Sequence, residues 1–263
     1  MLYNYNVEKF DLKGGLMVKF KIRLANLTVA VSALYESTRD FCSDYLTDAE
    51  PDFSVEVTEA DVLFEDKKSD AERKLEGLPP FKYSGEYLET LALYRRITEQ
   101  MAYRGVILFH GSAVMLDGEA YIFTARSGTG KSTHTRLWRE VFGSRAAMIN
   151  DDKPLISLEN GVPTVHGTPW RGKHGLGSNI SAPIRAICIL SRAESNEISK
   201  VSYLFALPEL LSQTYRFSDT DGMQSVLSTL DKVASATPIF RLGCNMDREA
   251  AIVAYNGMKG KTK

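Results

Sequence analysis

The chain has 263 residues, 44% of them hydrophobic and 25% charged, a composition typical of a folded globular protein rather than a disordered one. Its 32 basic and 33 acidic residues give a net charge of −1, which excludes recruitment of nucleic acid or of an anionic membrane by a global field. Cys42, Cys188 and Cys244 are too scattered for a zinc motif or a disulfide framework. With neither a signal-peptide pattern nor an apolar run of membrane-spanning length, we expect a cytoplasmic protein.

The first third of the chain predicts a small α+β lobe. Alternating apolar and polar residues indicate strands at 18–24, 27–31 and 53–57, and the spacing of Leu34, Phe41 and Tyr45 fits a short helix. The charged segment 67–82 contains a Gly-Leu-Pro-Pro breaker, so we place a boundary between an N-terminal lobe (1–84) and a core (85–263). This lobe carries no recognisable chemistry. We expect it to pack against the core or to mediate homo-oligomer formation.

The sequence of the core predicts a mixed α/β fold with largely antiparallel sheets and flanking helices. Two hairpin signals, Asp117-Gly118 and Asn160-Gly161, each join two short apolar segments. Apolar periodicity places helices at 87–104, 207–215, 223–234 and 248–255, and strands at 106–109, 113–116, 119–124, 146–149, 155–158, 162–165, 186–190 and 238–242.

The segment between the strand 119–124 and a helix beginning near Lys131 has the pattern of a phosphate-binding loop. Glycines at a strand-to-helix turn let main-chain N–H groups and the positive end of the helix dipole face an anion, and a lysine adds a point charge. The expected nucleotide-binding residues are Ser127, Gly128, Thr129, Gly130, Lys131, Ser132 and Thr133. Ala125 stands where the usual pattern has its first glycine, so we expect φ to be negative there. Because the preceding strand returns from a hairpin, the loop departs from the usual parallel-sheet setting.

Two carboxylates follow the strand 146–149, about twenty residues beyond the loop lysine. Carboxylates at a strand end suit a magnesium-nucleotide site. Neighbouring residues of a strand point to opposite sides, so one of Asp151 and Asp152 can face the metal and the other the acceptor. His110 is placed to hold Asp151 or to help accept the proton, although a histidine satisfied by the backbone is nearly as common.

The order of His110-Gly111, the loop 127–132 and Asp151-Asp152 resembles the catalytic core of HPr kinase/phosphorylase, which is similar to that of phosphoenolpyruvate carboxykinase. The resemblance covers residues 106–190. It implies a kinase fold of this superfamily in which Lys131 contacts the phosphates, Ser132 and Asp152 serve the metal, and Asp151 is the general base beside His110.

These observations predict a kinase that uses ATP, or another nucleoside triphosphate, and Mg²⁺ to phosphorylate a hydroxyl group. Arg171 and Lys173, in the glycine-rich segment 166–179, are candidates to close over the transferring phosphoryl group. Arg192 and Arg216 are weaker candidates for the same role.

The acceptor that we favour is a small polyhydroxylated molecule such as a sugar or cyclitol. Trp170 offers a flat apolar face for its ring, and His166, Thr168, Arg171 and His174 offer donors around it. A place for Trp170 in the core is an equal alternative. A serine in an HPr-like protein or a peptide is the alternative acceptor. A carboxykinase-type reaction and a non-catalytic nucleotide switch are less favoured, and the donor can also be ADP or pyrophosphate.

Overall fold

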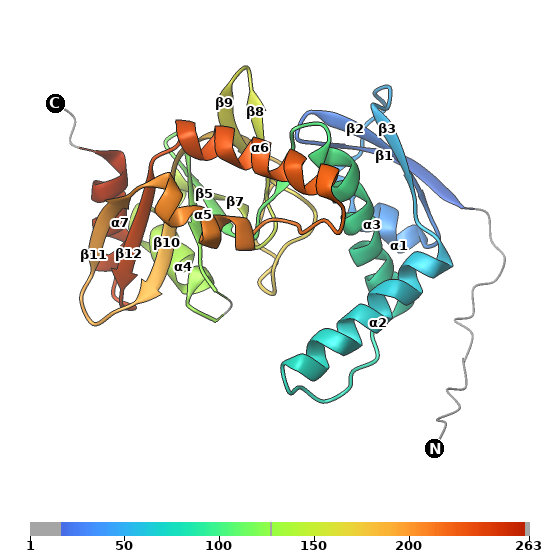
Figure 1. Cartoon of the computed structure of the whole chain (residues 1–263), viewed down its shortest axis with the longest axis horizontal. Helices are drawn as coiled ribbons and strands as arrows, with labels where there is room; N and C mark the ends of the chain where they lie inside the picture. The colour runs from blue at the N-terminus through green and yellow to red at the C-terminus, as the bar shows by residue number, and fades with distance from the viewer. Residues whose placement is uncertain (1–16, 127, 261–263) are drawn as a thin grey trace. The chain divides into compact units, whose positions relative to one another are not determined.

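The computed structural model describes residues 17–126 and 128–260, which form two compact units (Figure 1). The first unit comprises residues 17–22 and 28–97, and the second comprises residues 23–27 and 98–260. Helix α3 (Gly85–Ala102) contributes residues to both units. Among the described residues, no helix combines the length and the apolar character that a membrane span needs.

The first unit contains a three-stranded sheet in the order β1 (Val18–Leu24), β2 (Leu27–Ala33) and β3 (Phe53–Glu56). Its helices are α1 (Glu36–Phe41), followed by the short 3₁₀ turn Ser43–Tyr45, α2 (Glu59–Leu75) and the first part of α3. The segment 67–82 was expected to be a charged connection, yet most of it lies in α2. A capping box between Thr58 and Asp61 starts this helix before the charged stretch begins.

The second unit contains a nine-stranded sheet in which seven strands follow the order β4-β8-β9-β10-β6-β5-β7, with β12 beside β10 and β11 beside β12. The strands are β4 (Ile107–Leu108), β5 (Ser112–Leu116), β6 (Glu119–Thr124), β7 (Ala146–Asn150), β8 (Leu155–Glu159), β9 (Val162–His166), β10 (Ser181–Arg192), β11 (Glu197–Val201) and β12 (Ile239–Cys244). Most neighbouring pairs are antiparallel, as the sequence predicts, and β6 and β12 run parallel to β10. Both expected hairpins form, with positive φ at Asp117, Gly118, Asn160 and Gly161.

Strand β10 joins two parts of this sheet. Its first residues, up to Pro183, pair with β9 in the antiparallel sense, and from Ile184 onwards the strand pairs in parallel with β6 and then β12, with a register shift between Ile184 and Ala186. Strand β6 therefore has an antiparallel neighbour, β5, on one side and a parallel neighbour, β10, on the other. The hairpin alone predicted that the strand before the phosphate loop would lack a parallel neighbour. That prediction was incomplete, because β10, which is distant in the sequence, gives β6 the parallel neighbour that phosphate loops usually have.

Alternate residues of β6 enter two separate cores. Ile122 packs with residues of α5 (Tyr203–Ser212) and α6 (Thr220–Ala236), whereas Tyr121 and Phe123 pack with residues of α4 (Lys131–Phe142) and α7 (Glu249–Lys259). Because successive side chains of a strand point to opposite faces, the sheet separates these helix pairs into two outer layers (Figure 1). Packing of the sheet between these two helix layers determines where the carboxyl ends of β6, β7 and β10 lie.

One core beneath the phosphate loop contains a buried histidine. The Nε2 atom of His134 accepts a hydrogen bond from the indole N–H of Trp138 at 3.1 Å, and burial lowers the pKa of His134 from 6.5 to about 4. A base with a lower pKa in the folded state is protonated first in the unfolded state. The stability that neutral His134 supports is therefore complete above pH 6.5 and is lost as the pH falls towards 4.

We expect the free energy of unfolding to fall by on the order of 3 kcal/mol between pH 6.5 and pH 4 through His134 alone. Chemical denaturation at a series of pH values measures this slope. His134→Gln keeps an acceptor for Trp138 and should flatten the curve, whereas His174→Gln, at an exposed site, should leave it unchanged. Parallel curves for the parent and His134→Gln would contradict the prediction.

Candidate functional site

The segment between β6 and α4 has the backbone of an anion-binding loop. Gly128 has φ +75° and Gly130, which precedes the first residue of α4, has φ +127°. Its N-cap residue, Gly130, has no side chain, and no acidic residue lies in its first turn, so among the described residues no capping group competes with an anion for its first N–H groups. Ala125 has a negative φ, as expected, and its buried side chain packs in the core shared with α4. Ser127 lies outside the described residues.

Lys131 begins α4 and returns towards the loop. Its Nζ donates a hydrogen bond to the carbonyl oxygen of Ala125 at 3.1 Å. Burial lowers the pKa of Lys131, and the nearby charge of Asp152 opposes this shift. The ammonium group of Lys131 is therefore close to both the loop and the Asp152 carboxylate. Burial has already removed part of its hydration, so its attraction for a bound anion is stronger than in open water.

Asp152, the second residue after β7, forms a hydrogen bond with the His110 side chain. The Nε2 atom of His110 lies 3.2 Å from Oδ1 of Asp152, and Nζ of Lys153 lies 3.9 Å from Oδ2. Burial alone would raise the pKa of Asp152, but the hydrogen bond from His110 and the charges of Lys153, His110 and Lys131 outweigh burial and lower it. The expectation that His110 would hold Asp151 is wrong, because His110 reaches the second carboxylate of the pair instead.

Asp151 has a different environment. Its side chain is buried, and its two oxygens accept hydrogen bonds from the main-chain N–H groups of Gly172 at 2.6 Å and Leu176 at 3.4 Å. A Cβ atom added to Gly172 would lie 3.2 Å from Oδ2 of Asp151, so a glycine allows this close approach. Asp151 thus ties the glycine-rich segment to the end of β7, while Asp152 carries the more accessible carboxylate.

These residues surround one cavity of about 500 Å³ in the second unit. Its lining consists of His110, Gly128, Gly130, Lys131, Ser132, Thr133, Asp151, Asp152, Gly172 and Lys173. Four segments of the sequence therefore meet there: the turn before β5, the phosphate loop, the end of β7 and the glycine-rich segment. The structure brings together most of the residues expected from the sequence, and Thr129 lines a neighbouring cavity.

Several residues expected to act on the acceptor lie elsewhere. Arg171 does not line this cavity, and Lys173 takes the corresponding place. Trp170, His166 and Thr168 are buried. The Nε2 atom of His166 lies 2.9 Å from the Ser157 hydroxyl, and burial lowers the pKa of His166 to about 4. These three residues serve the core, so the proposal that they form a sugar-binding surface is wrong.

The donor set suits a magnesium-nucleotide complex. The Ser132 hydroxyl and the Asp152 carboxylate carry oxygen atoms of the kind that Mg²⁺ prefers, and both residues line the same cavity. Within residues 17–126 and 128–260, no three His, Cys, Asp or Glu side chains group closely enough to hold a metal ion by themselves. Mg²⁺ is usually held by one or two protein oxygens together with phosphate oxygens and water, so a sparse set of protein ligands fits it.

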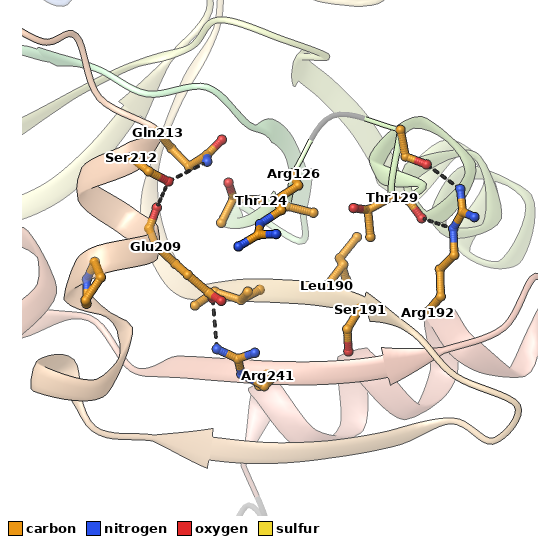
Figure 2. A pocket seen from close by; sticks show the side chains of 14 residues that line it. Thr124, Arg126, Thr129, Leu190, Ser191, Arg192, Glu209, Ser212, Gln213 and Arg241 are labelled. Atoms are coloured by element: carbon orange, nitrogen blue, oxygen red, sulfur yellow. Dashed lines mark hydrogen bonds and ion pairs between the residues drawn. The ribbon is translucent and has the colours of Figure 1, made fainter.

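A second cavity, of about 750 Å³, lies on the other side of the loop (Figure 2). Arg192, at the end of β10, donates to the carbonyl oxygens of Gly128 at 2.5 Å and Thr129 at 3.4 Å. Sequence patterns gave Arg192 only as a weak candidate and gave no signal for Arg126, Glu209 or Arg241, which also line this cavity. Arg126 occupies a variable position of the phosphate loop, and neither Glu209 nor Arg241 belongs to a motif. The proximity of these three residues depends on the pairing of β10 with β6 and β12.

No family model matches the sequence, and no curated protein matches it either. Among solved structures, the chain is similar to the HPr(Ser) kinase/phosphatase from Coxiella burnetii, with 9% identity and a TM-score of 0.33. The match covers 56% of this chain and 90% of that one. At this identity and TM-score, the similarity is a distant likeness of fold and carries no information on substrate or reaction.

Proposed function

We propose that this chain is a nucleotide- and Mg²⁺-dependent phosphotransferase that acts on a hydroxyl group. One observation carries the proposal: the Asp152–His110 pair lines the same cavity as Gly128, Gly130 and Lys131. A phosphate-binding loop alone indicates only that an anion binds. A carboxylate that faces the same space adds a group able to accept the proton of an attacking hydroxyl.

Each residue has a distinct task in this proposal. The free N–H groups at the start of α4 and the ammonium group of Lys131 bind the phosphates and counter the negative charge that develops during transfer. The lowered pKa of Asp152 keeps its carboxylate ionised at neutral pH, so it can accept a proton, and His110 fixes its orientation. The Ser132 hydroxyl would help to hold a Mg²⁺ ion, which would supply positive charge against the phosphates when bound.

This assignment differs from the roles first expected for the two carboxylates, which were the general base for Asp151 and the metal for Asp152. Asp152 becomes the proton acceptor because it faces His110 and Lys153 at the cavity. Asp151 becomes a positioning residue because both of its oxygens accept main-chain N–H groups of the glycine-rich segment. Lys173, in the same segment, is the cation that we place beside the transferring phosphoryl group.

For the acceptor we propose a small polyhydroxylated molecule. The cavity offers His110, Thr133 and Lys173 as polar partners for several hydroxyl groups. Incubation of the purified chain with γ-labelled ATP and Mg²⁺ tests this, with a metabolite extract and whole-cell protein as separate acceptor pools. We expect label in the metabolite pool. Label confined to protein would replace the small acceptor by a protein serine, and nucleotide binding without transfer to either pool would make the chain a nucleotide-binding switch and overturn the phosphotransferase.

A further inference from the structure

The second cavity adjoins the phosphate loop but lies away from Asp152. In the sheet, β6 has β5 and then β7, which leads to Asp152, on one side, and β10 and then β12 on the other. The loop lies between the two cavities, because Gly128 lines both. A molecule with its phosphates on the loop can therefore extend its other end towards β10 and α5 without entering the space in front of Asp152.

The lining of this cavity combines apolar surface with polar groups at its edge. Ala125, Ile189, Leu190 and Pro208 supply the apolar part, and Glu209, Ser212 and Gln213 supply polar groups from the end of α5 (Figure 2). Ligand pockets of about 300–1,000 Å³ with such a lining commonly hold small organic molecules. At about 750 Å³, this cavity has room for a nucleoside.

Two arginines give the cavity a specific chemistry. Arg126 is exposed and has no ion-pair partner among the described residues, and its guanidinium group points into the cavity in Figure 2. A planar guanidinium stacks readily on an aromatic ring. The Nη2 atom of Arg241 lies 2.9 Å from a carboxylate oxygen of Glu209, which fixes an acceptor where sugar hydroxyl groups can donate.

We propose that this cavity binds the nucleoside part of the phosphoryl donor, with the base beneath Arg126 and the sugar near Glu209. The proposal rests on the proposed phosphotransferase function and narrows it, since it makes the donor a nucleoside phosphate rather than pyrophosphate. Arg192 connects the two sites, because it binds the loop carbonyls of Gly128 and Thr129 from the cavity side. The acceptor molecule does not bind in this cavity in our proposal, because its hydroxyl group must reach Asp152. Asp152 follows β7, which lies on the far side of β5 from β6 and β10.

Calorimetric titration with MgATP and with Mg²⁺-tripolyphosphate, which lacks a nucleoside, tests the proposal. We expect the parent chain to bind MgATP at least about tenfold more tightly than tripolyphosphate. Ser212→Phe, at an exposed position on the cavity edge, should weaken MgATP binding by about tenfold or more and change tripolyphosphate binding by less than about twofold. Ser228→Phe, at an exposed position of α6, is the matched control and should change neither affinity.

Arg126→Ala provides a second test, because the Arg126 side chain is exposed and has no ion-pair partner among the described residues. It should weaken MgATP binding by about two- to fivefold while sparing tripolyphosphate. Equal affinities of the parent for both ligands, with no selective effect of either variant, would overturn the nucleoside assignment and leave the phosphotransferase standing. Equal weakening of both ligands by Ser212→Phe would also overturn it, because the effect would then lie in the loop. Failure of the parent to bind either ligand would instead overturn the phosphotransferase itself.

Discussion

Asp152→Asn is expected to lower kcat by about 10²–10⁴ while nucleotide affinity stays within a few-fold of the parent value. The substitution keeps the size of the side chain and a hydrogen-bond acceptor for His110, but removes the basic oxygen that faces the cavity. Steady-state kinetics together with equilibrium binding of the magnesium-nucleotide complex separate the two quantities.

Asp117→Asn is the matched control, because Asp117 lies in the hairpin between β5 and β6 and Asn also tolerates its φ of +53°. It should leave kcat unchanged. Asp151→Asn should act mainly on thermal stability and on KM for the acceptor, since its carboxylate holds main-chain N–H groups. Equal losses of nucleotide affinity and kcat in Asp152→Asn would instead make Asp152 a metal ligand.

Lys131→Ala should abolish detectable transfer and weaken nucleotide binding by about tenfold or more, with little change in the melting temperature. The ammonium group is near the loop and bonds only to the carbonyl oxygen of Ala125 among the described contacts, so its removal costs the fold little. Binding is measured by calorimetry and folding by thermal denaturation of the free protein.

Lys232→Ala, at an exposed position of α6, is the control for removal of a lysine charge from the second unit. It should match the parent in binding and in melting temperature. Tight binding of MgATP by Lys131→Ala that equals the parent's would show that the loop does not hold the phosphates of the nucleotide.

Most helices and strands of the second unit could be predicted, because the signals for them lie within a few neighbouring residues. Asp117-Gly118 and Asn160-Gly161 specify tight hairpins, and the glycines at 128 and 130 take the positive φ values that the loop needs. The helix α2 and the strand β11 were missed. In α2, a capping box outweighed a charged and weakly periodic sequence, and β11 depends on its distant partner β12.

The candidate site was predicted only in part, because its geometry depends on pairings between distant segments. The sequence indicated that His110, Lys131 and the Asp pair belong together, and the structure gathers them around one cavity. It could not indicate which carboxylate faces His110, since this depends on how the strand end turns towards the glycine-rich segment. The sequence left Trp170 either as a face for a sugar ring or as a core residue, and the structure buries it.

The attachment of the glycine-rich segment to Asp151 has a consequence for how the side chains of this segment can change. The two hydrogen bonds come from main-chain N–H groups, which every residue except proline supplies. Lys173 and His174, between these two anchors, are exposed, so their side chains can be exchanged while the anchors remain. Selection in nature or in a library can therefore alter these two positions without dismantling the loop that presents them.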